Sequence, residues 1–252
     1  MVEPPHVSCQ AFCAGHVNDL WGWLKCGHFE IQSLNVMIMK NLIYLIFPLL
    51  SLKSSCQQTT RASSGNVRVG GSCEGCEAVY ETPVSFDQLT SSATLPDYSA
   101  PGISLHIQGR VFKSDGKTPA PNVVLYVYHT DQTGTYPVKG NERGWDRRHG
   151  YLRAWVRTNE KGEYSFLTKR PAPYPGGGNP AHIHCIVKEP DLNEYYIGDF
   201  LFVDDLYISD QQKKSTTFPG GNGVLNPELI NNRLEAKRDI YLGKNVRDYP
   251  QR

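Results

Sequence analysis

The sequence lacks an excess of charge of either sign, an internal repeat and a heptad pattern. Its 252 residues contain 26 Lys and Arg against 25 Asp and Glu, for a net charge of +1. Nucleic-acid binding depends on a surplus of basic residues, so the composition gives no reason to expect a nucleic-acid partner. The apolar run from Leu42 to Leu52 is too short to cross a hydrocarbon layer of about 30 Å as a helix. We therefore expect small-molecule ligands.

Residues that form turns are plentiful, and strand signals recur between them. Gly 23, Pro 17 and Tyr 14 are spread among short apolar runs, which favours an all-β fold. Alternation and apolar character predict strands at 103–112, 123–129, 151–158, 163–168, 181–188 and 196–203. The polar turn 159–162 predicts a hairpin between its two flanking strands, and a short helical turn is expected around 228–237. Residues 101–252 are thus predicted to form an antiparallel β-sandwich with long loops.

The segment 39–56 has the shape of a secretory signal. Met39 and Lys40 give a basic start, an apolar run follows, and small residues precede Cys56. The end of this segment resembles a bacterial lipoprotein signal, in which Cys56 would be lipidated, although Lys53 departs from that pattern. Plain cleavage near this point and a buried hydrophobic strand are the alternatives. If the segment is a signal, the protein is exported to the periplasm or cell surface, and a lipid anchor would be its contact with the membrane.

The segments on either side of this signal carry fewer clues. Since such signals begin a chain, we hypothesise that translation starts at Met39 and that residues 1–38 are a non-native upstream extension. Residues 57–100 read as a linker and CxxC segment, in which 57–72 is rich in small polar residues and reads as a flexible tether. Cys73 and Cys76 form a single CxxC, which is too few ligands for a structural zinc site. A local disulfide and an unpaired couple of thiols both remain open, and the sequence does not indicate an oligomeric state.

Two histidines stand one residue apart in "NPAHIHCIVK", residues 179–188. In a strand, His182 and His184 would share one face, while Ile183 and Cys185 would point to the other. Two imidazoles placed in this way can converge on one metal ion. Two exposed strand histidines are the alternative.

Two tyrosines in turn-rich loops are candidates to join this pair. Tyr136 follows the turn "DQTG", and Tyr174 lies in "RPAPYPGGGNP", where Pro and Gly can bring its side chain back over the strand. A phenol has a pKa near 10, so only a strongly charged metal ion would keep it deprotonated at neutral pH. Ferric iron meets this requirement best. Packing within the loop is the alternative for each tyrosine taken alone.

The order of these motifs resembles the intradiol ring-cleavage dioxygenases, the family of protocatechuate 3,4-dioxygenase and catechol 1,2-dioxygenase. "GTY" at 134–136, then "KGEYSFLT", "RPAPYP" and "PAHIH" follow one another over roughly residues 101–205. The resemblance implies a β-sandwich holding non-haem Fe(III) through Tyr136, Tyr174, His182 and His184. It further implies catechol and O2 as substrates, a muconate-type diacid as product, and Tyr174 as the catalytic base.

The chain departs from the family pattern in two places. The well-known enzymes have an Arg where this chain has Asn179, and neutral Asn in the substrate pocket would not supply the same charge. The nearest match to the family's Thr-Gln pair is Gly198 and Asp199. A non-catalytic, surface-anchored β-sandwich binding module, with or without iron, is the alternative function. Cupin and two-His-one-carboxylate sites need a further histidine downstream, and none follows His184.

Overall fold

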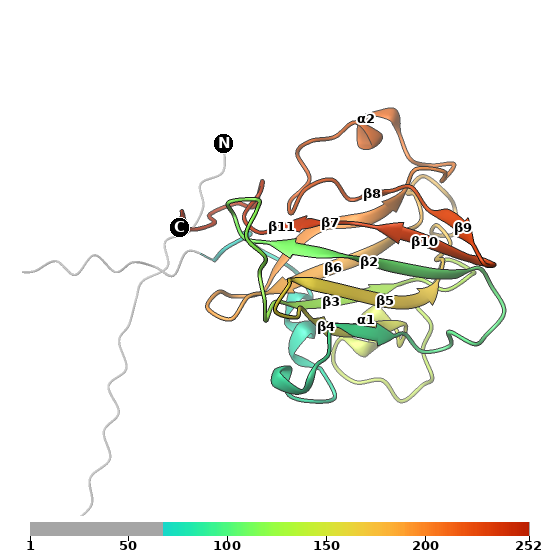
Figure 1. Ribbon diagram of the computed structural model, residues 1–252. Coiled ribbons are helices and arrows are strands. Elements are labelled where there is room, and N and C mark those ends of the chain that lie inside the picture. Colours follow the sequence, from blue (N-terminus) through green and yellow to red (C-terminus); the bar gives the residue numbers. More distant parts are fainter. Residues whose placement is uncertain (1–67, 252) are drawn as a thin grey trace, which may run out of the picture. The chain divides into compact units, whose positions relative to one another are not determined.

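Two β-sheets packed face to face make up the folded unit of the computed structural model (Figure 1). The model describes residues 68–251, so the predictions for the extension 1–38, the signal 39–56 and Cys56 lie outside the described residues. Within the described range, no helix is both long and apolar enough to cross a membrane. The predicted all-β sandwich is confirmed.

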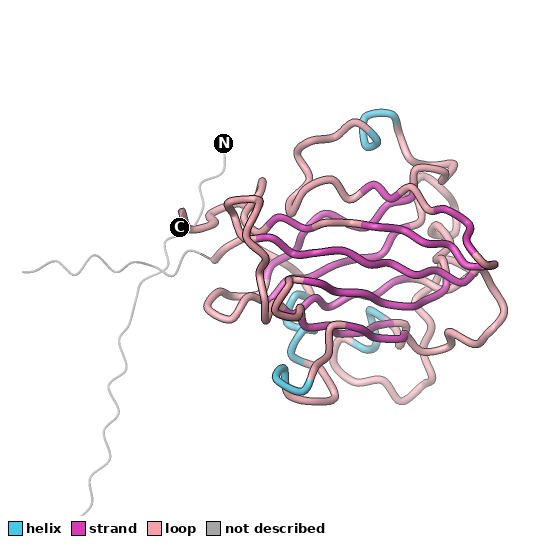
Figure 2. The backbone as a smooth tube through the Cα atoms, in the orientation of Figure 1, coloured by secondary structure: helices cyan, strands magenta, loops and turns pink. Residues whose placement is uncertain are grey.

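The strands divide between the two sheets. The first sheet contains, in spatial order, β1 (Ser92–Thr94), β5 (Glu163–Lys169), β2 (Ser104–Phe112), β10 (Arg233–Lys237) and β9 (Glu228–Ile230), and β11 (Ile240–Tyr241) pairs with the end of β2. The second sheet contains β4 (Arg153–Arg157), β3 (Val124–His129), β6 (His182–Lys188), β7 (Tyr195–Phe202) and β8 (Val224–Leu225). The helical segments are short: η1 (Cys76–Tyr80), η2 (Phe86–Gln88), α1 (Asp146–His149) and α2 (Asp210–Lys213). Long loops connect the strands around this double layer (Figure 2).

The core lies between the sheets because the central strands alternate. In β2, Leu105, Ile107 and Val111 are fully buried, while the side chains between them are more exposed. In β6, Ile183 and Cys185 are fully buried and face this core. The histidines of β6 therefore lie on the outer face of the second sheet, as the strand period predicts.

The predicted hairpin around residues 159–162 is wrong. β4 pairs with β3 in the second sheet, whereas β5 pairs with β2 and β1 in the first. The turn at Asn159 to Gly162 carries the chain from one sheet to the other, with Asn159 Oδ1 accepting from the backbone N–H groups of Lys161 and Glu163. The turn itself was predicted correctly, but a polar turn does not determine which strands its two neighbours pair with.

The predicted helical turn around 228–237 is also wrong. Glu228–Ile230 and Arg233–Lys237 form an antiparallel pair. Asn231 and Asn232 between them both have positive φ, 49° and 63°. Two consecutive residues of this kind make the two-residue turn that matches the twist of a hairpin, and Asn tolerates it. Several other pairs are parallel, including β10 with β2 and β7 with β8, so the sandwich is mixed.

The described part of the segment assigned to the linker belongs to the same compact unit as the sandwich. β1 extends the first sheet, and η1 packs on the outer face of the second. A disulfide joins Cys73 to Cys76. Trp155 of β4 donates its indole N–H to the carbonyl of Val79 at 2.9 Å. The segment 73–80 therefore covers part of the outer face of the second sheet, over Tyr126 and Ile186.

Candidate metal centre

The four side chains predicted as metal ligands converge on the outer face of the second sheet. The Tyr136 hydroxyl lies 2.6 Å from that of Tyr174 and 2.9 Å from Nε2 of His184. The Tyr174 hydroxyl lies 3.2 Å from Nε2 of His182, and the two Nε2 atoms are 3.2 Å apart. Ligands held at about 2.1 Å from one transition-metal ion, at right angles or slightly wider, lie roughly 3 Å from each other. These donor separations suit a single ion.

Both histidines direct Nε2 toward the tyrosine hydroxyls because Nδ1 already makes a hydrogen bond within the protein. The Nδ1–H of His182 donates to the carbonyl of Pro180 at 2.7 Å, and that of His184 donates to Oδ1 of Asp199 at 2.8 Å. A donor on Nδ1 leaves the lone pair of Nε2 free, which is the arrangement found in metal-ligating histidines.

A tight turn sets the position of Tyr136. Asp131 Oδ1 accepts from the backbone N–H groups of Thr133 and Thr135 at 2.8 and 3.2 Å. Gly134 between them has φ of 78°, and a Cβ at this position would overlap the carbonyl oxygen of Pro173. Only glycine permits this approach between the two loops without strain.

The second loop brings Tyr174 over β6. The backbone N–H of Ala172 donates to the carbonyl of Asp131 at 3.0 Å, and the Thr130 hydroxyl donates to the carbonyl of Ala172 at 2.7 Å. Tyr174 itself is only partly buried. The two loops are therefore tied to each other just before they deliver their tyrosines.

Burial favours the neutral forms of Tyr136, Tyr174 and His182 in the protein alone. It raises the pKa of both Tyr136 and Tyr174, and the hydrogen bond between their hydroxyls raises that of Tyr136 further. Burial also lowers the pKa of His182. Two neutral phenols and an imidazole with a free lone pair are hard oxygen and borderline nitrogen donors, and a tripositive ion would deprotonate the phenols on binding. The donor set fits ferric iron.

The sequence interpretation did not give Asp199 a role, and the structure does. Asp199 lies on β7 and binds Nδ1 of His184, and its own pKa is lowered by that hydrogen bond despite burial. His182, His184 and Asp199 also form a group that could hold a metal ion. Because Asp199 contacts Nδ1 while the tyrosines contact Nε2, its carboxylate orients the His184 ring from behind. In the sequence, the sign of this role was a single acidic residue within the otherwise apolar strand Tyr195–Phe202.

Two further aromatic residues were missed. The ring of Tyr128 stacks between His184 and His149, at centroid distances of 4.6 and 3.8 Å. The Tyr126 hydroxyl bonds Nδ1 of His149 at 2.9 Å. Tyr126, Tyr128 and His184 all project from the outer face, which strand alternation alone could have shown.

A small cavity opens beside the four side chains. Its volume is about 180 Å³, and its lining residues are Glu74, Tyr128, Tyr136, Trp145, Arg148 and His149. Arg148 forms an ion pair with Glu74 across this lining. Asn179, predicted to lie in the substrate pocket, is exposed in the loop before β6 and is not part of the lining.

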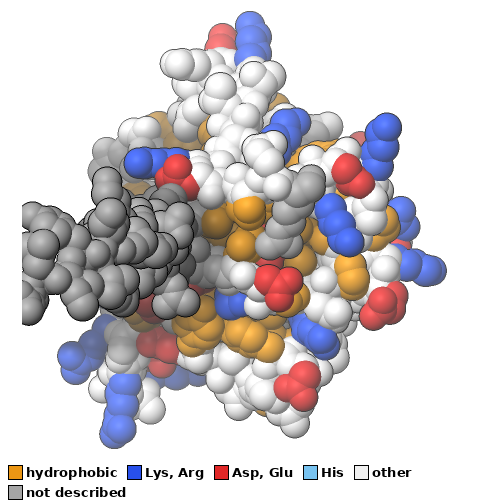
Figure 3. Space-filling model, turned by 90° about the vertical axis from the view of Figure 1, so that its left-hand side faces the viewer, with side chains coloured by type: hydrophobic (Ala, Val, Ile, Leu, Met, Phe, Trp, Pro, Cys, Tyr) orange, Lys and Arg blue, Asp and Glu red, His pale blue; other side chains and the backbone are white. Residues whose placement is uncertain are grey.

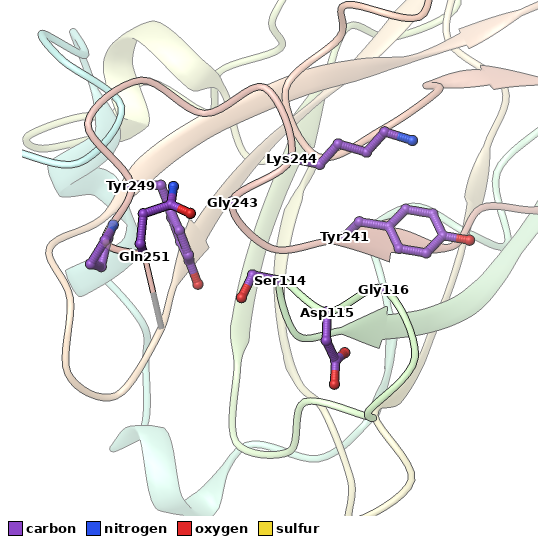
Figure 4. A pocket seen from close by; sticks show the side chains of 9 residues that line it. Ser114, Asp115, Gly116, Tyr241, Gly243, Lys244, Tyr249 and Gln251 are labelled. Atoms are coloured by element: carbon purple, nitrogen blue, oxygen red, sulfur yellow. The ribbon is translucent and has the colours of Figure 1, made fainter.

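A larger cavity of about 520 Å³ lies at the other end of the sandwich, between the turn after β2 and the loop after β11 (Figure 4). Lys244 and Tyr241 line one side, and Tyr249 and Gln251 line the other. The loop bearing Tyr174 instead leaves β5 beside the beginning of β2, where Lys169 pairs with Ser104. On the described part of the face visible in Figure 3, acidic and basic side chains are interspersed.

Comparisons with known proteins agree with this geometry. The model of a dioxygenase family matches residues 79–241. A catechol 1,2-dioxygenase 2 of Acinetobacter lwoffii is 32% identical over 137 residues, covering 48% of this chain and 46% of the relative. A hydroxyquinol 1,2-dioxygenase of Corynebacterium glutamicum is 29% identical over 156 residues, covering 50% of each. The chain thus spans about half the length of the curated relatives it matches.

The chain also resembles solved structures of dioxygenases. An intradiol ring-cleavage dioxygenase from Tetranychus urticae is 21% identical, with a TM-score of 0.45, over 61% of this chain and 86% of that one. The family model covers more than half of the present chain, including all four converging side chains. The chain therefore belongs to the intradiol ring-cleavage dioxygenase family.

Proposed function

We propose that this protein is a non-haem Fe(III) dioxygenase that opens the ring of a catechol between its two hydroxyl-bearing carbons. The observation that carries the proposal is the convergence of the Tyr136 and Tyr174 hydroxyls with Nε2 of His182 and His184 at mutual distances near 3 Å. These four side chains would hold ferric iron, which would supply the Lewis acidity and electron-accepting capacity that make a catechol reactive toward O2. The reaction adds both atoms of O2 to the substrate and yields a muconate-type diacid.

The ligands differ in their freedom to move. Tyr136 is fixed by the Asp131 turn, and His184 is fixed by Asp199 and by the stacked Tyr128 ring. Tyr174 lies beyond the last backbone tie between its loop and the Tyr136 loop, and its side chain is partly exposed. We therefore assign to its phenolate oxygen the role of base, accepting a proton from the incoming catechol.

The cavity beside Tyr136 supports a small aromatic substrate. A volume of about 180 Å³ is below the roughly 300 Å³ at which pockets for drug-sized ligands begin, so it suits a single ring. The aromatic side chains of Tyr128 and Trp145 are part of its lining. Asn179 is exposed and uncharged, so the charge that the family Arg supplies has no counterpart at this position.

Isotopic oxygen tests the proposed reaction. The iron-loaded protein is incubated with catechol under ¹⁸O2, and the product is examined by mass spectrometry. Incorporation of two labelled atoms, with one O2 consumed per catechol, is expected, and the His184→Ala variant should show neither. Iron binding without turnover would contradict the enzymatic role and favour the non-catalytic binding module.

We also propose that the protein is exported, as its signal-like segment 39–56 suggests. The Cys73–Cys76 disulfide supports this, because such bonds persist in oxidising compartments. The mass of the mature N-terminus tests it. Lipidated Cys56 or a free N-terminus near this residue is expected, and a mature protein that retains residues 39–56 would contradict it.

A further inference from the structure

Arg238 is a buried arginine with no carboxylate partner among the described residues. It follows β10 and is only 3% exposed. Its Nη1 donates to the carbonyl of Gly198 at 2.7 Å, while Nε and Nη2 have no hydrogen-bond partner in the described part of the chain. Burying a guanidinium with so few hydrogen bonds costs folding free energy. Core stability therefore does not explain Arg238, and its role lies in what it contacts.

The residue that Arg238 contacts lies in a β-bulge next to the metal centre. Ile183 pairs with Phe200 and Cys185 with Ile197, so Gly198 and Asp199 of β7 together oppose His184 alone. The backbone N–H of Gly198 donates outside this pair, to the carbonyl of Pro219 at 2.8 Å. Bulges of this kind re-aim a side chain and are frequent beside active sites.

Arg238 is itself held firmly. Its backbone N–H donates to the carbonyl of Gln108 at 3.0 Å, and its carbonyl accepts from the Tyr164 hydroxyl at 2.8 Å. Its guanidinium lies 4.4 Å from the ring centre of Phe200. The first sheet therefore fixes Arg238, and Arg238 reaches across the core to fix the bulge in the second sheet.

We propose that Arg238 is a positioning residue of the metal centre. It holds the carbonyl of Gly198, which sets the direction of the next residue, Asp199, and Asp199 holds the Nδ1 edge of His184. The inference rests on the proposed function for the identity of the metal. The hydrogen bonds that link Arg238 to His184 are present without any metal ion. The guanidinium acts from the core side of β7, while the ligands lie on the outer side.

Two readouts test this role. The first is the affinity for ferric iron, measured by competition with a chelator, together with the visible absorption band. We expect Arg238→Met to weaken iron binding at least tenfold and shift the band, and Arg238→Lys to recover most of the loss, because an ammonium can still donate to the Gly198 carbonyl. The second is the NMR signal of the His184 Nδ1–H in the metal-free protein, which should lose its hydrogen-bonded shift in Arg238→Met.

The matched control is Thr158→Val, which removes buried hydrogen bonds to the Val123 N–H and the Ala120 carbonyl and leaves Arg238 and its contact with Gly198 untouched. It should lower the melting temperature without changing iron affinity or the His184 signal. In an Asp199→Asn background, Arg238→Met should change iron affinity less than twofold, since its effect passes through Asp199. If Arg238→Met does not fold, Arg238→Gln and Arg238→Lys are compared in its place.

A folded Arg238→Met protein with unchanged iron affinity and an unchanged His184 signal would overturn the inference. A loss of iron affinity that adds fully to that of Asp199→Asn would overturn it as well. If the unsubstituted protein binds no ferric iron, the proposed function fails, and the His184 signal still decides the role of Arg238.

Discussion

At the scale of single residues, each histidine of the proposed centre gives Nδ1 to a protein group and points Nε2 toward the other candidate ligands. His182 gives Nδ1 to a backbone carbonyl, whereas His184 gives Nδ1 to the carboxylate of Asp199. A carboxylate partner makes the imidazole a stronger ligand than a carbonyl does, because it stabilises positive charge on the ring. The orientation of His184 therefore depends on a side chain, Asp199, which a substitution can remove, whereas that of His182 depends on the backbone.

Replacing Asp199 by Asn tests this dependence. Loss of the charge should weaken iron binding about 10- to 100-fold, as for other outer-shell partners of ligating histidines. A chelator competition measures the change. Asp115→Asn, in the turn after β2 and far from the centre, is the control. Equal iron affinity in the Asp199→Asn and Asp115→Asn proteins would refute the role of Asp199.

His129 gives a second prediction at this scale. It is 1% exposed between the sheets, bonded to the Thr130 carbonyl and to the Thr168 hydroxyl, and burial lowers its pKa to about 4. The unfolded chain, with a pKa near 6.5, binds the proton first as the pH falls. The free energy of unfolding should therefore drop between pH 6.5 and 4, by up to about 1.4 kcal/mol per pH unit from this residue.

Urea unfolding of the metal-free protein between pH 4 and 6.5 measures how the free energy of unfolding changes with pH. The same measurement on His129→Gln is the comparison. The variant should lose part of the slope. Another part remains, because burial also lowers the pKa of His149 to about 4. An identical slope in both proteins would show that His129 takes up its proton in the folded state.

At the scale of elements, the centre depends on loops that approach each other more closely than ordinary side chains allow. Gly134 in the Tyr136 turn faces the carbonyl of Pro173, the residue before Tyr174. The strand β6 supplies two ligands by simple alternation, whereas the tyrosines depend on this single point of approach.

Gly134→Ala should separate the two tyrosines. The added Cβ collides with the Pro173 carbonyl, and a positive φ costs an alanine about 1–2 kcal/mol in addition. We expect a lower melting temperature and a loss of the visible band. Gly140→Ala isolates the backbone cost, since Gly140 has φ of 92° and nothing within 4 Å of its missing Cβ. Retention of the band in Gly134→Ala would contradict this account of the loops.

Prediction from sequence succeeded where a local period decides the structure. The alternation in β2 and β6 gave the correct strands and the correct face for His182 and His184. It failed where a local pattern does not decide the structure: the turn at 159–162 joins strands of different sheets, and residues 228–237 form a hairpin through two asparagines with positive φ instead of a helical turn. Asp199 was missed for the same reason, since its role appears only once β6 and β7 lie side by side with a bulge.

At the scale of the whole molecule, the proposed metal centre lies outside the core that holds the sheets together. The buried apolar side chains between the sheets form one continuous cluster, and the four converging side chains stand on the outer face of the second sheet. The fold should therefore not depend on iron.

We expect the metal-free protein to unfold cooperatively, with the circular dichroism of a β protein. Ferric iron should raise its melting temperature, because binding adds about 2.7 kcal/mol to the free energy of unfolding when the free iron concentration is a hundred times the dissociation constant. Calorimetry with and without iron measures this. A chain that unfolds when iron is removed would show that the sandwich depends on its centre.

The visible absorption spectrum of the iron-loaded protein, before and after addition of catechol, tests the central claim most directly. Two tyrosinates bound to ferric iron should give a strong burgundy band, and binding of catechol at the centre should shift it. Tyr136→Phe should weaken the band. A protein that stays colourless after loading with ferric iron would contradict the assignment of Tyr136, Tyr174, His182 and His184 as one metal centre.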